Sequence, residues 1–225
     1  MGSGEADARP PQVRVLVVDD HALVRDSLRR ALGAEPDLDA VGTTGTLAGA
    51  AELIHTLRPD VVLLDNALPD GRGAHAVDEL VARHREAAVV LLTATLSLGV
   101  ARAAVTHGAA GVVTKTRGVE PVLDAVRAAA RGDAAVAPEL LQRLLGRASR
   151  PAQALPPGTD KYAAVDLDLL ARLAAGATLR DAAIARDLAD DEVHALVARA
   201  AVALGGRSTL ETLTRAAEAG LLVAS

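Results

Sequence analysis

The chain has 225 residues, of which half are hydrophobic, with one tyrosine and no phenylalanine, tryptophan or cysteine. The absence of cysteine excludes disulfides and thiolate metal sites, and a net charge of −5 argues against a chain that coats nucleic acid. No apolar stretch is long enough for a membrane-spanning helix, and residues 1–12 have no signal or transit pattern. We expect a cytoplasmic protein of one large or two modest domains, without membrane contact, after a disordered segment over residues 1–12.

Short apolar runs alternate with longer stretches of helical period between residues 13 and 133. Continuous runs of this kind are typical of strands buried on both faces of a parallel sheet, and the stretches between them are long enough for crossover helices. This pattern predicts a five-stranded parallel sheet, doubly wound and flavodoxin-like, with helices on both faces. The predicted strands are Val13–Val18, Leu38–Val41, Val61–Leu64, Ala88–Leu92 and Gly111–Val113.

The pattern changes after Asp133. Glu139–Gly146 is expected to form a short helix, and Ala148–Asp160, rich in proline and glycine, a linker. Residues 167–222 have helical period with three breaks, which predicts four short helices. The expected domains are therefore an α/β domain over 13–133, a linker with a short helix over 134–160, and a small all-α domain over 161–225.

Polar residues follow the predicted strands of the α/β domain. Asp19 and Asp20 end the first run, Asp65 the third, Thr93 the fourth and Lys115 the fifth. Carboxyl ends of parallel strands meet at one edge of the sheet, and three carboxylates brought together there favour a divalent cation such as Mg²⁺. With a hydroxyl and an ammonium group added, the set is equipped to receive a phosphoryl group on an aspartate.

Asp65 is the expected nucleophile, because the loop after it contains proline and glycine that can hold the turn open. An alternative for each acid alone is a structural role, with Asp20 as the N-cap of the next helix and the others as turn residues. Five polar residues in this order favour a phosphoryl-accepting site.

Four segments of the α/β domain are distinctive: VVDDHALVRDSL (17–28), DVVLLDNALPDGRG (60–73), LLTA (91–94) and GAAGVVTK (108–115). Together they resemble the receiver domain of bacterial two-component response regulators, and the sequence of the first is similar to the NarL/FixJ branch. The resemblance implies that Asp65 accepts a phosphoryl group from a sensor histidine kinase. It also implies that Asp19 and Asp20 hold Mg²⁺ with Asp65 and the main-chain carbonyl of Asn66, and that Thr93 and Lys115 bind the phosphoryl oxygens.

One position departs from the resemblance. An aromatic residue is expected three positions before Lys115, where this chain has Val112. A small β-branched side chain cannot move a large area in or out of the surface, so phosphorylation is weakly coupled to the outer face unless movement around Thr93 is enough.

The C-terminal helices resemble a LuxR-type helix-turn-helix domain, most clearly in LGGRSTLETLTRAAEAGLL (204–222). The resemblance implies that the third helix enters the DNA major groove and that the fourth contributes to a homodimer. The third helix nevertheless opens with Asp190, Asp191 and Glu192, and residues 160–225 hold seven basic and ten acidic residues. An excess of acidic residues is poorly suited to contacts with DNA phosphates. The three acids at the start of the helix have an alternative structural explanation, because they complement the helix dipole. The candidate DNA contacts are Arg180, His194, Arg199 and Arg207.

Three hypotheses remain for the function. The favoured one is a transcription regulator in which phosphorylation of Asp65 controls dimerisation and binding to promoter DNA. The alternatives are a signalling adaptor whose helical domain has weak or lost DNA binding and acts through protein contacts, and a regulator controlled by a bound ligand. We do not expect an enzyme, because the chain has no Ser/His/Asp arrangement, histidine-rich metal set or P-loop.

Overall fold

A parallel sheet forms the centre of the N-terminal part of a computed structural model, which describes residues 12–84, 86–152, 162 and 164–224. Its five main strands lie in the order β2-β1-β3-β6-β7 and all pair in parallel. The predicted sheet is therefore confirmed, with some strands longer than expected. The strands are β1 (Val13–Val18), β2 (Leu38–Thr44), β3 (Val61–Asp65), β6 (Ala88–Thr93) and β7 (Gly111–Thr114).

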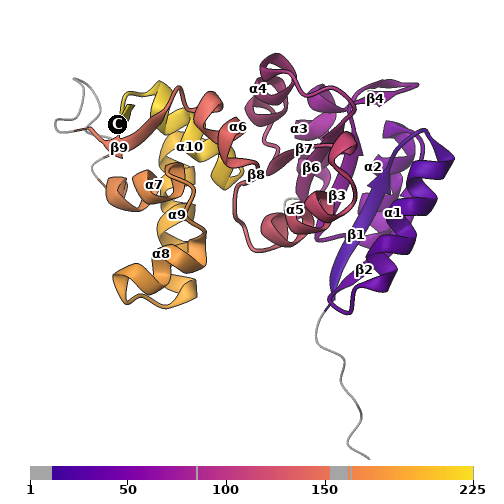
Figure 1. The fold of residues 1–225 in the computed structure, drawn as a ribbon, viewed down its shortest axis with the longest axis horizontal. Coiled ribbons are helices and arrows are strands. Elements are labelled where there is room, and N and C mark those ends of the chain that lie inside the picture. Colours follow the sequence, from indigo (N-terminus) through magenta and orange to yellow (C-terminus); the bar gives the residue numbers. More distant parts are fainter. Residues whose placement is uncertain (1–11, 85, 153–161, 163, 225) are drawn as a thin grey trace, which may run out of the picture.

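Helices cover both faces of this sheet (Figure 1). Alternate side chains of each strand enter two separate hydrophobic clusters, because successive strand residues point to opposite faces. One cluster joins the strands to α1 and α5, and the other joins them to α2, α3 and α4. This is the doubly wound arrangement. The helices are α1 (Ala22–Ala34), α2 (Leu47–Leu57), α3 (Gly73–Arg83), α4 (Leu98–Thr106) and α5 (Glu120–Ala130).

A sixth short strand, β8 (Ala135–Val136), extends the sheet beyond β7. The prediction of five strands was wrong here, because two residues are too few to show a period. The pairing is close: a Cβ atom at Gly111 would lie 2.3 Å from the carbonyl oxygen of Ala135, so glycine is required there. Two further departures are the small hairpin of β4 (Ala67–Leu68) and β5 (Gly71–Arg72), and the 3₁₀ turn η1 (Lys115–Arg117) that follows β7.

The C-terminal part contains the four predicted helices, α7 (Leu167–Ala174), α8 (Leu179–Arg186), α9 (Asp190–Leu204) and α10 (Thr209–Glu218), after the short helix α6 (Pro138–Leu144). The linker predicted for residues 148–160 was wrong at its start, where β9 (Ala148–Pro151) pairs with β10 (Leu222–Ala224). The helical region predicted to reach residue 222 therefore ends earlier, with α10 at Glu218, and Leu222 belongs to β10. Residues 1–11, predicted to be disordered, and most of the remaining linker lie outside the described residues.

The two parts lie side by side, joined through β8 and α6 (Figure 1). Leu140, Leu141 and Leu144 of α6 belong to the hydrophobic cluster that also contains Leu169 and Leu210 of the helical part. Among the described helices, none combines the length and the apolar character needed to cross a membrane.

Candidate functional site

The strand order brings the predicted polar residues to one edge of the sheet. Strands β1, β3, β6 and β7 are neighbours, and they carry Asp19, Asp65, Thr93 and Lys115 at or just after their carboxyl ends. Asp19, Asp65 and Thr93 are 0%, 3% and 4% exposed, which is unusual for polar side chains and indicates partners within the site. The predicted position of these residues, at the carboxyl ends of neighbouring parallel strands, is therefore confirmed.

Lys115 lies between the two buried carboxylates. Its Nζ atom forms a short contact with Asp19 and lies 3.0 Å from Oδ1 of Asp65. One ammonium group thus faces two carboxylates. Buried carboxylates of like charge repel each other, so this edge of the sheet retains an excess of negative charge that a cation would neutralise.

The cluster also includes Asp20 and His21. Ligand atoms of Asp19, Asp20, His21 and Asp65 all lie within 4.8 Å of one another. A set dominated by carboxylate oxygens is the chemistry that a hard divalent cation prefers, so the residues fit such an ion. His21 was missed by the sequence reasoning, although it directly follows the two aspartates.

The N-cap alternative for Asp20 was wrong. The residue at the N-cap of α1 is His21, and no side chain caps that helix end. Oδ1 of Asp19 accepts a hydrogen bond from the His21 amide at 2.9 Å, while Asp20 lies 2.6 Å from Nδ1 of the His21 ring. The Asp20 side chain therefore does not cap α1, and it lies within the acidic cluster.

The loop after Asp65 packs tightly against the site. The Asn66 carbonyl, a predicted metal ligand, accepts a hydrogen bond from the Gly73 amide at 3.1 Å, and a carbonyl oxygen has a second lone pair. The Asn66 side chain accepts from the Ala74 amide at 3.2 Å. A Cβ atom at Gly73 would lie 2.2 Å from the Asp65 carbonyl oxygen, so only glycine permits this approach.

Thr93 is turned toward the loop that leads to α4. Its hydroxyl donates to the carbonyl oxygen of Thr95 at 2.9 Å, and α4 begins soon afterwards, capped by Ser97. The side chain that the sequence assigns to phosphoryl binding therefore stabilises the loop before α4.

The four candidate DNA contacts fall into two pairs. Arg180 on α8 and Arg199 on α9 are exposed. His194 and Arg207 are also exposed, but they line a cavity of about 470 Å³ between the helical part and the far edge of the sheet. In the described arrangement α9 therefore presents only part of its surface to solvent.

Several hydrogen bonds hold the helical part against the α/β part. The hydroxyls of Ser208 and Thr209 donate to the carbonyl oxygens of Ala109 and Gly132 at 2.9 and 2.5 Å. The Leu179 amide donates to the buried Asp133 carboxylate at 2.8 Å. No sequence signal marks Asp133 except its place at the predicted domain boundary.

His194 adds a contact from α9. Its ring nitrogens lie 2.6 Å from the carbonyl oxygen of Asp190 and 2.9 Å from that of Arg131. Hydrogen bonds to these two carbonyls, aided by the charges of Asp190 and Asp133, raise the pKa of His194.

The acids at the start of α9 have a structural role. Ala189 is the N-cap residue, and the Glu192 carboxylate accepts a hydrogen bond from the Ala189 amide at 2.8 Å. Asp190 is therefore not the N-cap, although negative side chains in this first turn still favour the helix dipole.

Comparison with known proteins gives the same assignment for both parts. The response regulator receiver domain matches residues 15–127. The chain is 35% identical over 212 residues to the DNA-binding transcriptional activator DevR/DosR of Mycobacterium tuberculosis, covering 91% of this chain and 92% of that protein.

Two solved structures share the fold. A LuxR-family two-component response regulator from Aurantimonas sp. has a TM-score of 0.55 at 27% identity, over 58% of this chain and 94% of that one. The RcsB response regulator of Salmonella typhimurium has a TM-score of 0.55 at 19% identity, over 91% and 97% of the two chains. The chain belongs to the two-component response regulators, as a transcription factor of the NarL and DevR type rather than a metabolic enzyme.

Proposed function

We propose that this protein is a cytoplasmic response regulator in which a sensor histidine kinase phosphorylates Asp65 and thereby frees the helical domain to bind promoter DNA as a homodimer. The observation that carries the proposal is the buried Asp65 carboxylate, 3.0 Å from Lys115 and within the acidic cluster. Such a carboxylate has the ammonium group of Lys115 beside it and other acids that can hold a divalent cation.

Asp19, Asp20 and Asp65, with the Asn66 carbonyl, would hold Mg²⁺ in this proposal. When bound, the ion would neutralise the negative charge of an incoming phosphoryl group. The chain's own contribution is to orient the acids and to keep the ammonium group of Lys115 within reach of both buried carboxylates.

The transfer forms a bond between an oxygen of Asp65 and the phosphorus atom. The bond from phosphorus to the donor histidine nitrogen breaks, and the electron pair stays on the donor's imidazole, which takes up a proton. Lys115 then pairs with a phosphoryl oxygen instead of the free carboxylate. The Thr93 hydroxyl leaves the Thr95 carbonyl and donates to a second phosphoryl oxygen.

The position of α4 supports a path to the helical domain. This helix begins beside the Thr93–Thr95 loop, and the residues after its other end reach Gly108, which lies against the Arg207 side chain. A shift of the Thr93 loop would therefore displace α4 and disturb the contacts of Ser208 and Arg207 with the receiver domain.

A surface next to the site suits the kinase. Leu23 on α1 is 84% exposed. It borders a hollow of about 260 Å³ that also includes Val24, Val119 and Lys115. An exposed leucine beside a shallow apolar hollow is the kind of surface that a protein partner covers.

DNA binding by the helical domain is supported by its similarity to DevR/DosR, which is described as a DNA-binding transcriptional activator. Arg180 and Arg199 are already exposed for phosphate or base contacts. His194 and Arg207 are exposed as well, but they line the cavity that faces the receiver domain, so separation of the helical domain would clear the space that DNA needs to reach them.

The alternative of a protein-binding adaptor is favoured by one observation, the exposed acids Asp190, Asp191 and Glu192 at the start of α9. Selection from a random-sequence DNA pool at low salt, with and without phosphorylation, separates the two functions. The proposed function predicts one enriched motif with two half-sites, about one helical turn apart. Failure to enrich any motif with phosphorylated protein would support the adaptor.

A further inference from the structure

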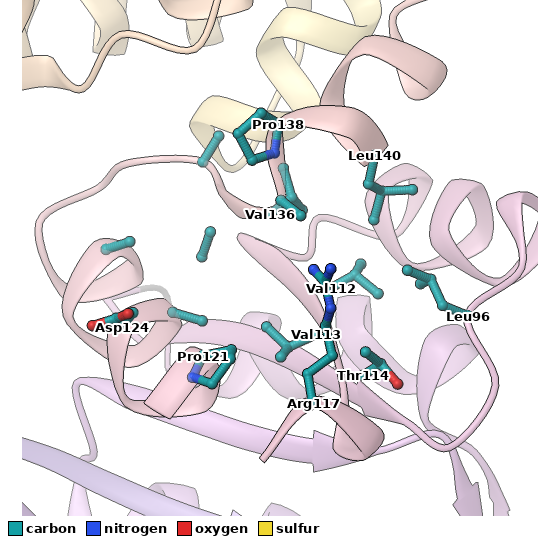
Figure 2. Close-up of a pocket in the computed structure, with 15 residues that line it drawn as sticks. Leu96, Val112, Val113, Thr114, Arg117, Pro121, Asp124, Val136, Pro138 and Leu140 are labelled. Carbon is teal, nitrogen blue, oxygen red and sulfur yellow. The ribbon is translucent and has the colours of Figure 1, made fainter. Parts of the chain in front are cut away.

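A cleft of about 330 Å³ opens between the receiver domain and the chain that leads to the helical domain. Strand β7 forms its floor and α5 one side, and residues 134–140 form the other side. Figure 2 shows Val136, Pro138 and Leu140 above the floor residues Val112 and Val113. The cleft lies apart from the Asp65 site, so a ligand here would not compete with a phosphoryl group.

The lining is apolar and made of small side chains. Alanine, valine, proline and leucine contribute most of it, and none of the residues that line it carries an aromatic ring. Val112, at the position where an aromatic residue was expected, contributes only two methyl groups. An aliphatic cavity of about 150 Å³ is enough to bind benzene. The cleft therefore has room for one ring with a short substituent.

Arg117 supplies a positive charge at this cleft. Figure 2 shows its side chain extending from η1 along the opening toward Val112. Within the described part of the chain, the Arg117 side chain has no ion pair or hydrogen bond. An unpaired guanidinium beside apolar walls is complementary to a carboxylate attached to an apolar group.

The other polar groups of the lining are weaker candidates for ligand contacts. Asp124, the one acid among the lining residues, lies at the opposite end of the cleft from Leu96 in Figure 2. Its side chain is 77% exposed and lies 3.9 Å from Arg127. The Thr114 hydroxyl already bonds with that of Thr116 at 2.9 Å. Charge complementarity therefore favours an anionic ligand held by Arg117.

We propose that this cleft binds a small aromatic carboxylic acid, with its ring between Val112, Ala128 and Val136 and its carboxylate on the Arg117 guanidinium. A guanidinium pairs with a carboxylate through two parallel hydrogen bonds. A rigid ring buries apolar area without the entropy cost of ordering rotatable bonds, which disfavours a flexible aliphatic acid of equal volume.

A ligand bound in the cleft would affect both the phosphorylation site and the helical domain. Its floor, β7, leads directly to Lys115, which pairs with Asp65. Its other side leads into α6, whose leucines share a hydrophobic cluster with the helical domain. A ligand that contacts both sides would stabilise the packing of residues 134–140 on the receiver domain, and so act as a second input beside phosphorylation.

The test is an NMR titration of the full-length protein with phenylacetate, and with phenethylamine as a probe of similar shape and opposite charge. Saturable shifts should centre on the amides of Val112, Arg117 and Val136 with phenylacetate only. Arg117 is exposed and a solvent-exposed ion pair contributes little, so Arg117→Gln should weaken binding about two- to fivefold. Arg102→Gln, at an exposed arginine of α4 outside the cleft, should leave it unchanged.

Two further variants fill the cleft from different sides. Val112→Phe adds a ring at the floor, and Ala128→Leu adds volume from α5, a change that a half-buried helix position tolerates. Either variant that retains the fold by circular dichroism should lose phenylacetate binding. Shifts that do not saturate, equal binding of phenethylamine, or unchanged affinity in Arg117→Gln and Ala128→Leu would each overturn the proposal.

Discussion

The Nε2 atom of His194 lies 2.9 Å from the main-chain carbonyl oxygen of Arg131, which ties α9 to the end of α5. Its Nδ1 atom lies 2.6 Å from the carbonyl oxygen of Asp190. Because a carbonyl oxygen only accepts hydrogen bonds, both ring nitrogens must donate, and only the charged imidazolium has a proton on each. The docked position of α9 therefore favours protonated His194.

This contact predicts that docking depends on pH. The pKa of His194 is raised in the docked state, so the stabilisation is fully present below its ordinary value of about 6.5 and is lost as the pH rises through the raised value. A histidine NMR titration should give a pKa above about 6.5 in the full chain.

Hydrogen exchange provides the control for this prediction. The Leu179 amide, which donates to Asp133 across the interface, should exchange faster above neutral pH after correction for the intrinsic rate. In His194→Gln the corrected rate should lose most of this dependence. An unchanged pH dependence in the variant would assign the effect to a group other than His194.

Gly73 should be irreplaceable beside Asp65. In Gly73→Ala the new Cβ atom would lie 2.2 Å from the Asp65 carbonyl oxygen, so the loop must move, at a cost of about 1–3 kcal/mol in the free energy of unfolding. Phosphorylation by acetyl phosphate should also slow. The matched control is Gly33→Ala in α1, where nothing lies within 4 Å, and which should stabilise the helix by about 0.5–1 kcal/mol. Equal stability of the two variants would contradict the geometry.

Binding of Mg²⁺ should raise the thermal stability of the protein through the acidic cluster. Saturation to 100 times the dissociation constant contributes about 2.7 kcal/mol. Asp20→Asn should reduce this gain while retaining the Lys115 contacts with Asp19 and Asp65. Asp26→Asn, an exposed acid on α1, serves as the control and should respond like the unmodified protein. Calorimetry with and without Mg²⁺ measures the difference, and the same gain in all three proteins would exclude Asp20 as a ligand.

Weakening the interface should increase DNA binding without phosphorylation. Thr209→Val removes the hydroxyl that donates to the Gly132 carbonyl oxygen. One hydrogen bond contributes about 0.5–1.5 kcal/mol, so affinity for a selected DNA should rise about two- to tenfold. Thr56→Val, whose hydroxyl donates within α2 to the carbonyl oxygen of Glu52, should leave DNA binding unchanged. Weaker DNA binding by Thr209→Val would show that the receiver domain does not restrain α9.

The sequence predicted the main sheet and the acidic site because both depend on local signals. Buried runs such as Val61–Leu64 identify the strands, and Asp65 follows its run directly. Once the strands are parallel, their carboxyl ends must share one edge. His21 required the structure, because its place in the cluster depends on how the chain turns into α1.

Contacts between the two domains were not predictable in the same way. Three of them use main-chain carbonyl oxygens, of Ala109, Arg131 and Gly132, which every residue carries and no pattern marks. The strands β8, β9 and β10 are too short to show alternation, and all three depend on pairing with distant segments. The role of Glu192 in the first turn of α9 likewise became visible only with its partner atom.

The most direct test of the central claim is intact-mass analysis of the full-length protein after incubation with acetyl phosphate and Mg²⁺. We expect one phosphoryl group on the unmodified protein and on Asp26→Asn, and none on Asp65→Asn, with the modification lost in hydroxylamine as for an acyl phosphate. Uptake of a phosphoryl group by Asp65→Asn, or no uptake by the unmodified protein, would contradict the assignment of Asp65.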